Sequence, residues 1–121
     1  MSTTADTTLR TESLTTIHWA GIVLAVVTGV LHLVLGVSFI SEQMGWAFLF
    51  AGVGFLGGIA ALLMDYRRRL LYLLGIPFTA GQIVAWYVVN APDFSVLGYV
   101  DKVAQVLLIA VLVVLYRQAS P

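Results

Sequence analysis

The sequence predicts an all-α fold, an integral membrane four-helix bundle, and three observations support that prediction. Of the 121 residues, 60% are hydrophobic and only 10% are charged, whereas a soluble domain carries roughly 25% charged residues. The mean hydropathy is +0.99. The few charges lie in short segments between long uncharged ones. A domain of this size has too much surface to face water with so few charges, so we expect it to be surrounded by the lipid bilayer.

The first predicted helix covers residues 17–40 and follows a polar tail. Residues 1–16 are rich in threonine and are expected to form a disordered cytoplasmic tail. No Asp, Glu, Lys or Arg lies between Glu12 and Glu42, so the stretch exceeds the roughly 20 apolar residues that a membrane span requires. It is also longer than the core of a signal peptide, and no small-residue cleavage site follows it. We therefore interpret it as a retained span.

The second and third predicted helices cover residues 45–64 and 70–89. Each lies inside an uncharged stretch, Glu42–Asp65 for the second and Arg69–Asp93 for the third. Both stretches can hold the roughly 20 apolar residues of a span. Together with the first and fourth helices they make up one transmembrane domain, residues 17–116.

The fourth predicted helix covers residues 97–116 and has the shortest uncharged stretch of the four. Its uncharged stretch begins only after Lys102 and ends at Arg117. To reach the length of a span, the helix must include Asp101 and Lys102, which we place at the membrane interface. Residues 117–121 are expected to form a short cytoplasmic tail.

Basic residues near the span ends predict that both termini lie in the cytoplasm of a multi-pass cell membrane protein. With an even number of spans, one side of the membrane receives five arginines, and the other receives Glu42 and the turn at 90–93. The residues on the predicted cytoplasmic side are Arg10, Arg67, Arg68, Arg69 and Arg117.

Each predicted helix has one face of small or polar residues, and these faces are expected to meet in the centre of the bundle. On the second helix, Gly54 and Gly58 form a GxxxG motif, which is typical of closely packed helices in lipid. The residues predicted to pack helices together are Gly21, Ala25, Gly29, Ala51, Gly54, Gly58 and Ala61.

A polar layer is predicted slightly outward of the membrane midplane. His32, Gln82 and Gln105 fall at similar depths on three different helices, with Thr28 and Thr79 nearby. Each of these groups would cost several kcal/mol in hydrocarbon if it had no hydrogen-bond partner. We therefore expect them to bond to one another inside the bundle.

A second polar cluster is predicted at the cytoplasmic membrane face. His18, Asp65, Arg67, Arg68 and Arg69 all lie near that end of their helices. The arginine run determines membrane topology in the simplest interpretation, and it can also contact anionic lipid headgroups.

Several functional classes are disfavoured by the composition. The net charge is zero, with six basic and six acidic residues, so a general basic surface for nucleic acid is absent. The chain has no cysteine, and its sequence contains no phosphate loop, catalytic triad or metal-ligand motif. We expect no enzyme activity, no catalytic residues and no metal site.

Three functional interpretations remain. The first is a helix-packing accessory or structural module that works with a second copy or a membrane-protein partner. The second is a small-solute or proton transporter or channel using the polar layer around His32. The chain has the size of the small multidrug-resistance exporters, but the first helix lacks their membrane-embedded glutamate. Asp65 and Asp101 are placed at span ends, so no buried carboxylate is expected.

The third interpretation is a haem-binding electron-transfer subunit. His18 and His32 are 14 residues apart, which puts them on one helix face about 21 Å apart. This resembles the paired histidines of cytochrome b-type proteins. Two haems need four axial ligands, so a second copy would have to supply the other two. We expect no cofactor unless this arrangement forms.

Several stretches resemble an uncharacterised haloarchaeal family of small four-span membrane proteins. They are residues 18–21 (HWAG), 26–36 (VVTGVLHLVLG), 66–77 (YRRRLLYLLGIP) and 101–105 (DKVAQ). The resemblance covers nearly the whole chain and implies a membrane location and a four-helix fold. It implies no activity.

Overall fold

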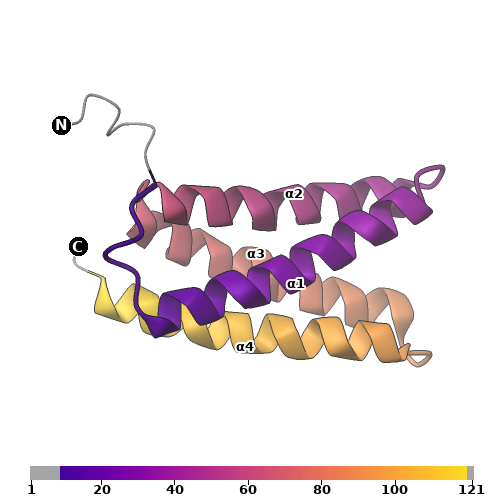
Figure 1. Cartoon of the computed structure of the whole chain (residues 1–121). Helices are drawn as coiled ribbons and strands as arrows, with labels where there is room; N and C mark the ends of the chain where they lie inside the picture. The colour runs from indigo at the N-terminus through magenta and orange to yellow at the C-terminus, as the bar shows by residue number, and fades with distance from the viewer. Residues whose placement is uncertain (1–8, 120–121) are drawn as a thin grey trace.

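Residues 9–119 are described by a computed structural model, and they form four α-helices that run antiparallel to their chain neighbours (Figure 1). The predicted all-α four-helix fold is confirmed, with helix ends within a few residues of those predicted. The elements are α1 (Thr16–Ser38), α2 (Gln43–Leu63), α3 (Arg68–Asn90) and α4 (Val96–Gln118). Residues 1–8 of the predicted N-terminal tail and the last two residues lie outside the described range.

All four helices are long and apolar enough to cross a membrane. They contain 21 to 23 residues, which corresponds to about 32–35 Å at about 1.5 Å per residue and matches a hydrocarbon core of about 30 Å. Large apolar side chains cover the outside of the bundle, for example Phe50 at 75% and Val96 at 80% exposure. The chain is therefore built as a multi-pass membrane protein, since so much exposed apolar surface suits lipid rather than water.

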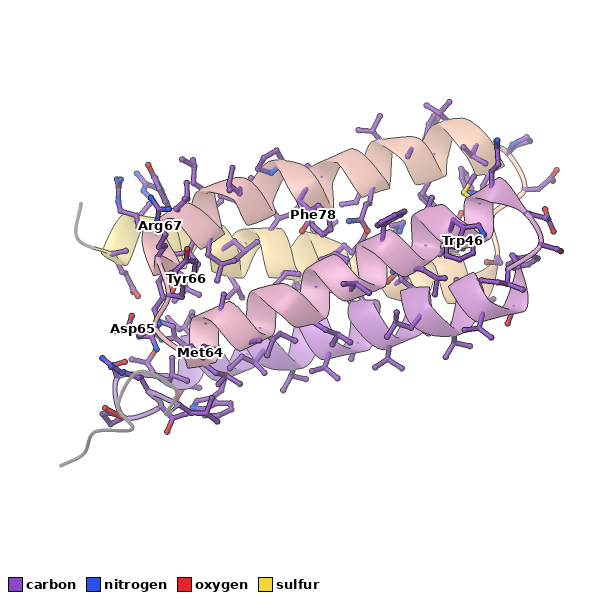
Figure 2. All side chains as sticks on the ribbon, turned by 90° about the horizontal axis from the view of Figure 1, so that it is seen from above. Trp46, Met64, Asp65, Tyr66, Arg67 and Phe78 are labelled. Carbon is purple, nitrogen blue, oxygen red and sulfur yellow. The ribbon has the colours of Figure 1, made fainter. Side chains whose placement is uncertain are left out.

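The bundle has two chemically different ends. Both described chain ends and the α2–α3 turn lie at one end, here called the terminal end, and the α1–α2 and α3–α4 loops lie at the distal end (Figure 1). The α2–α3 turn is tight, because Asp65 and Arg67 both adopt positive φ angles of 55° and 49°. Met64, Asp65, Tyr66 and Arg67 mark this turn in Figure 2.

The closest helix contact joins α1 and α2 through glycines spaced seven residues apart. A Cβ atom added to Gly52 would lie 2.9 Å from the carbonyl oxygen of Gly29, and one added to Gly36 would lie 2.9 Å from that of Gly45. The seven-residue spacing keeps both glycine pairs on one seam between antiparallel helices. Of these four glycines, only Gly29 was predicted to pack helices together.

The GxxxG motif of α2 lies elsewhere. Gly54 faces the ring of Phe78, and a Cβ added to Gly58 would meet only the side chain of Leu71, at 3.6 Å. Both glycines line a cavity rather than a close backbone contact. The other predicted packing residues differ in how deeply they are buried. Gly21 and Ala25 are buried on α1, whereas Ala51 and Ala61 are only partly buried.

The four helices do not pack equally well. Helix α1 lies against α2 and α4, and α3 lies against α4, but α2 and α3 have few contacts. Only Tyr72 and Thr79 of α3 are buried. The gap between α2 and α3 holds the two cavities that define the candidate sites, and Phe78 projects into it from α3 (Figure 2).

Candidate functional site

A buried hydrogen-bonded network links α1, α3 and α4 in the distal half of the bundle. The Thr28 hydroxyl donates to Oδ1 of Asp101 at 2.6 Å. The Gln105 amide Nε2 donates to Thr28 Oγ1 at 3.1 Å and to Gln82 Oε1 at 3.0 Å. Thr28 and Gln105 are fully buried. These bonds satisfy polar groups that would otherwise be costly in hydrocarbon.

Asp101 and Lys102 form an ion pair inside the bundle. Lys102 Nζ donates to Asp101 Oδ2 at 2.6 Å, and the two residues are only 7% and 8% exposed. The expectation that no carboxylate is buried was wrong, because the bundle encloses the Asp101 side chain. Asp101 lies on the same face of α4 as Gln105 and Leu108, which are also buried, and Thr28 of α1 donates a hydrogen bond to its carboxylate.

His32 lies beside the network and contacts both Thr28 and two aromatic rings. Its Nδ1 lies 2.7 Å from the carbonyl oxygen of Thr28. Because a carbonyl only accepts, Nδ1 carries the proton in this geometry. The same nitrogen is 4.0 Å from Asp101 Oδ1. The imidazole also packs against the rings of Phe48 and Phe55, with centroids 5.8 and 5.9 Å away.

The structure therefore brings together Thr28, His32, Gln82 and Gln105, which the sequence placed in one polar layer. Thr79 differs, because its buried hydroxyl has no hydrogen-bond partner within residues 9–119. The Gln105 Oε1 atom is likewise buried without a partner in that part of the chain. The network thus retains unused hydrogen-bonding capacity at its centre.

A distal cavity of about 430 Å³ lies beside the network. Most of its wall is apolar, and the polar side chains of His32, Gln82, Asp101 and Lys102 lie on it together with Trp86. Lys102 Nζ lies 5.9 Å from the Trp86 ring. The cavity reaches the loops at the distal end, because Asn90 and Ser95 also line it. A molecule in the cavity would meet these polar groups together with a larger apolar surface.

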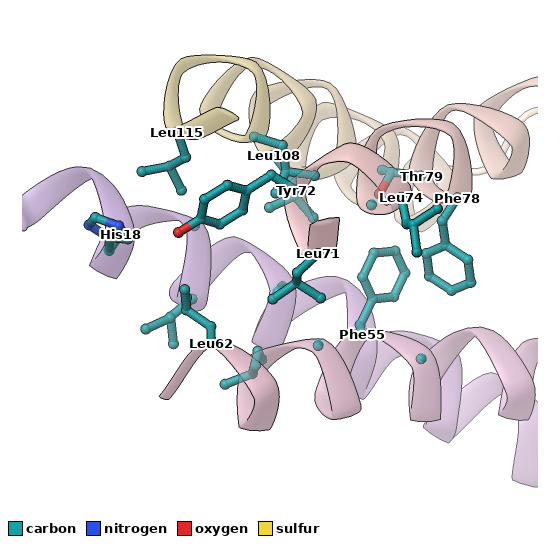
Figure 3. A pocket seen from close by; sticks show the side chains of 18 residues that line it. His18, Phe55, Leu62, Leu71, Tyr72, Leu74, Phe78, Thr79, Leu108 and Leu115 are labelled. Atoms are coloured by element: carbon teal, nitrogen blue, oxygen red, sulfur yellow. The ribbon is translucent and has the colours of Figure 1, made fainter. Parts of the chain in front are cut away.

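A terminal cavity of about 330 Å³ occupies the other half of the α2–α3 gap and is almost wholly apolar (Figure 3). Its polar side chains are His18, Tyr72 and Thr79. The Tyr72 hydroxyl points toward His18, and Phe55 and Phe78 lie toward the other end of the cavity (Figure 3). These two phenylalanine rings pack edge to face with centroids 5.1 Å apart, and Phe55 also contacts His32 of the distal network.

The predicted cytoplasmic-face cluster is organised around Arg68. Its guanidinium donates to the Leu62 carbonyl at 3.0 Å, to Ser13 Oγ at 2.7 Å and to the Arg10 carbonyl at 2.8 Å, and Nε lies 3.2 Å from Asp65 Oδ1. The described part of the predicted tail is thereby held against the bundle.

The other members of this cluster have separate roles. His18 Nδ1 accepts from the backbone N–H of Thr15 at 3.0 Å and so caps the start of α1. Arg69 lies over the Tyr116 ring at 4.3 Å, and Arg67 is exposed. Arg68 and Asp65 are therefore the members of the cluster joined by an ion pair.

The two histidines considered as haem ligands line different cavities, His18 the terminal one and His32 the distal one. Each has its Nδ1 engaged by a backbone group of α1 or its cap. Within residues 9–119, no three His, Cys, Asp or Glu side chains are grouped closely enough to hold a metal ion.

The sequence model of a family described as "Family of unknown function (DUF7475)" matches residues 3–116. No curated protein and no solved structure matches the chain.

Proposed function

We propose a function for a chain that belongs to the family of unknown function DUF7475 and forms a bundle of four helices able to span a membrane. The proposal is that the distal cavity binds a small polar solute of zero net charge, and that the protein belongs to the transport class. Catalysis plays no part in it. The observation that supports it best is the buried Asp101–Lys102 pair on the wall of an accessible cavity.

The ion pair favours binding over a purely structural role. A buried ion pair is a weak stabiliser, because the cost of removing both charges from water offsets most of their attraction. Helix packing alone would be served equally well by apolar side chains at both positions. Ionisable residues inside a membrane domain usually mark a binding site or a path for solutes, and Asp101 and Lys102 both face the cavity.

The chemistry of the wall indicates the class of solute. The carboxylate and the ammonium cancel each other, so the site carries no net charge to attract a lone cation or anion. Lys102 has donor capacity beyond its bond to Asp101, and the amides of Gln82 and Asn90 lie on the same wall. A neutral or zwitterionic molecule with both donors and acceptors matches these groups.

Continuous conduction receives less support than binding. The hydrogen-bonded chain runs from Lys102 through Asp101, Thr28 and Gln105 to Gln82. Beyond it lies the apolar terminal cavity, which offers no row of polar groups for water or protons. Passage to the terminal end would require α2 and α3 to move apart, and their sparse contacts favour such a motion.

We also propose that the terminal end faces the cytoplasm and that the membrane is the cell membrane of an archaeon. The orientation is supported by the arginine run of the α2–α3 turn and by Arg10 and Arg117, all carried by segments at the terminal end. The source is suggested only by the resemblance to small haloarchaeal membrane proteins. In this orientation the distal cavity opens to the outside.

Uptake into proteoliposomes tests the proposed function. Radiolabelled glycine and glycerol represent zwitterionic and neutral solutes, and choline and acetate represent single charges. We expect uptake of glycine or glycerol above that of empty vesicles and at least tenfold loss of it with Lys102→Met. Arg117→Gln, which changes an exposed charge away from the cavity, is the matched control and should retain uptake.

Equal uptake by wild type and Lys102→Met, or uptake restricted to choline or acetate, would contradict the proposal. If wild-type vesicles take up none of the four solutes, the helix-packing accessory interpretation gains support. That interpretation makes its own prediction, the co-purification of a stoichiometric membrane-protein partner or a second copy in gentle detergent.

A further inference from the structure

We infer that the terminal cavity holds one hydrocarbon chain of an anionic membrane lipid, whose phosphate lies at the α2–α3 turn beside Arg67. This site is separate from the distal solute site. It follows from the lining of the terminal cavity, the position of its mouth, and the charge of the turn next to that mouth.

The lining of the cavity matches a hydrocarbon chain. Apart from His18, Tyr72 and Thr79, its walls are apolar. Glycines widen it, because Gly54 and Gly58 on α2 and Gly75 on α3 place no side chain in the space. A volume of about 330 Å³ is too large to stay empty at the packing density of protein interiors, and so apolar a space does not favour water.

The mouth of the cavity faces the lipid. The lining residues contributed by α1 and α4 are mostly buried, whereas Gly54, Leu74 and Phe78, on α2 and α3, are exposed. The opening therefore lies between α2 and α3, the two neighbouring helices with few contacts. A lipid chain can enter sideways through this opening without crossing a polar surface.

The charge at the terminal end of the opening matches an anionic headgroup. The turn from Asp65 to Arg69 carries three arginines and one aspartate, a formal charge of +2. Each guanidinium nitrogen of Arg68 donates to a protein group, including the carbonyl of cavity residue Leu62. Arg67 is exposed, and its guanidinium has no partner within residues 9–119. It is therefore available to a phosphate at the level of the headgroups.

Native mass spectrometry of the whole chain in gentle detergent tests the inference with two probes, dioleoyl phosphatidylglycerol and dioleoyl phosphatidylcholine. We expect one bound phosphatidylglycerol per chain at low lipid concentration and weaker retention of phosphatidylcholine. Gly58→Leu should abolish the stoichiometric adduct, because the new side chain occupies the cavity. Gly57→Leu is the matched control and should retain it, since a Cβ there meets no described atom within 4 Å.

The arginine is tested independently of the cavity. Arg67→Gln should lower the preference for phosphatidylglycerol about fivefold, the effect of one basic residue near an anionic headgroup. Arg117→Gln removes the same charge at the same end of the bundle, but from α4, and should leave the preference unchanged. Arg67 is exposed, so its substitution reports on binding even if Gly58→Leu prevents folding.

Two results would overturn the inference. One is equal retention of the two lipids by the wild type. The other is that a variant and its control lose phosphatidylglycerol equally, either Gly58→Leu and Gly57→Leu or Arg67→Gln and Arg117→Gln. Equal losses would indicate non-specific adsorption. Neither result bears on glycine or glycerol uptake, so the lipid site and the solute site succeed or fail separately.

Discussion

The buried charges of Asp101 and Lys102 compensate each other inside the bundle. Removing one partner leaves a buried charge uncompensated, which costs about 3–5 kcal/mol, whereas replacing both by apolar residues is often neutral or stabilising. We therefore expect Lys102→Met alone to lower the unfolding free energy by about 3 kcal/mol in detergent, and Asp101→Leu combined with Lys102→Met to restore most of it. Thermal unfolding followed by circular dichroism measures both. Additive losses in the double variant would show that the pair is not coupled.

Thr28 and Thr79 provide a matched comparison of two buried hydroxyls. Thr28 donates to Asp101 and accepts from Gln105, while the Thr79 hydroxyl has no partner in the described part of the chain. Thr28→Val should cost about 1–3 kcal/mol, because both neighbours lose a bond. Thr79→Val should be neutral or stabilising. The same unfolding measurement decides between them, and equal losses would mean that Thr79 has a partner, such as a bound water.

The candidate site could be predicted from the sequence only in part. The positions of His32, Gln82 and Gln105 along their helices, and the polar faces they share, predicted that they lie in one layer. Asp101 also lies on the Gln105 face of its helix, which was a usable signal. Asp101 was nevertheless expected not to be buried, because it lies near the end of the fourth span. The hydrogen bond from Thr28 that makes burial tolerable depends on how α1 and α4 pack, and no local pattern contains that information.

At the scale of elements, the α1–α2 seam depends on glycines at Gly29, Gly36, Gly45 and Gly52. Gly52→Ala should destabilise the protein by about 1–3 kcal/mol, because the added methyl group meets Leu33 and the Gly29 carbonyl and forces the helices apart. Gly57→Ala should instead be neutral or stabilising by up to about 1 kcal/mol, since alanine favours helix and the site is open. A comparison of melting temperatures tests this contrast, and equal effects would contradict the close seam.

The element boundaries were easier to predict than the packing faces. Uncharged stretches of span length, bounded by charges, located all four helices. The GxxxG motif drew attention to Gly54 and Gly58, yet the tight seam uses glycines seven residues apart. A cavity lies beside Gly54 and Gly58 instead, because α2 and α3 have few contacts there and the glycines place no side chain in the space.

At the scale of the whole molecule, the proposed orientation can be tested cleanly because the chain has no cysteine. Glu42→Cys places a single thiol at the distal end, and Gln118→Cys places one at the terminal end. In intact cells, a membrane-impermeant maleimide should label the Glu42→Cys variant and should label the Gln118→Cys variant only after permeabilisation. The reverse pattern would place the termini outside.

The loose α2–α3 seam also determines how a ligand of the terminal cavity must be quantified. A molecule that enters through this seam comes from the bilayer, so its occupancy follows its mole fraction among the surrounding lipids and not its aqueous concentration. Diluting the buffer at a fixed lipid-to-protein ratio should leave occupancy unchanged, while diluting the anionic lipid with neutral lipid should empty the cavity. In effect, the composition of the membrane sets the loading of the protein.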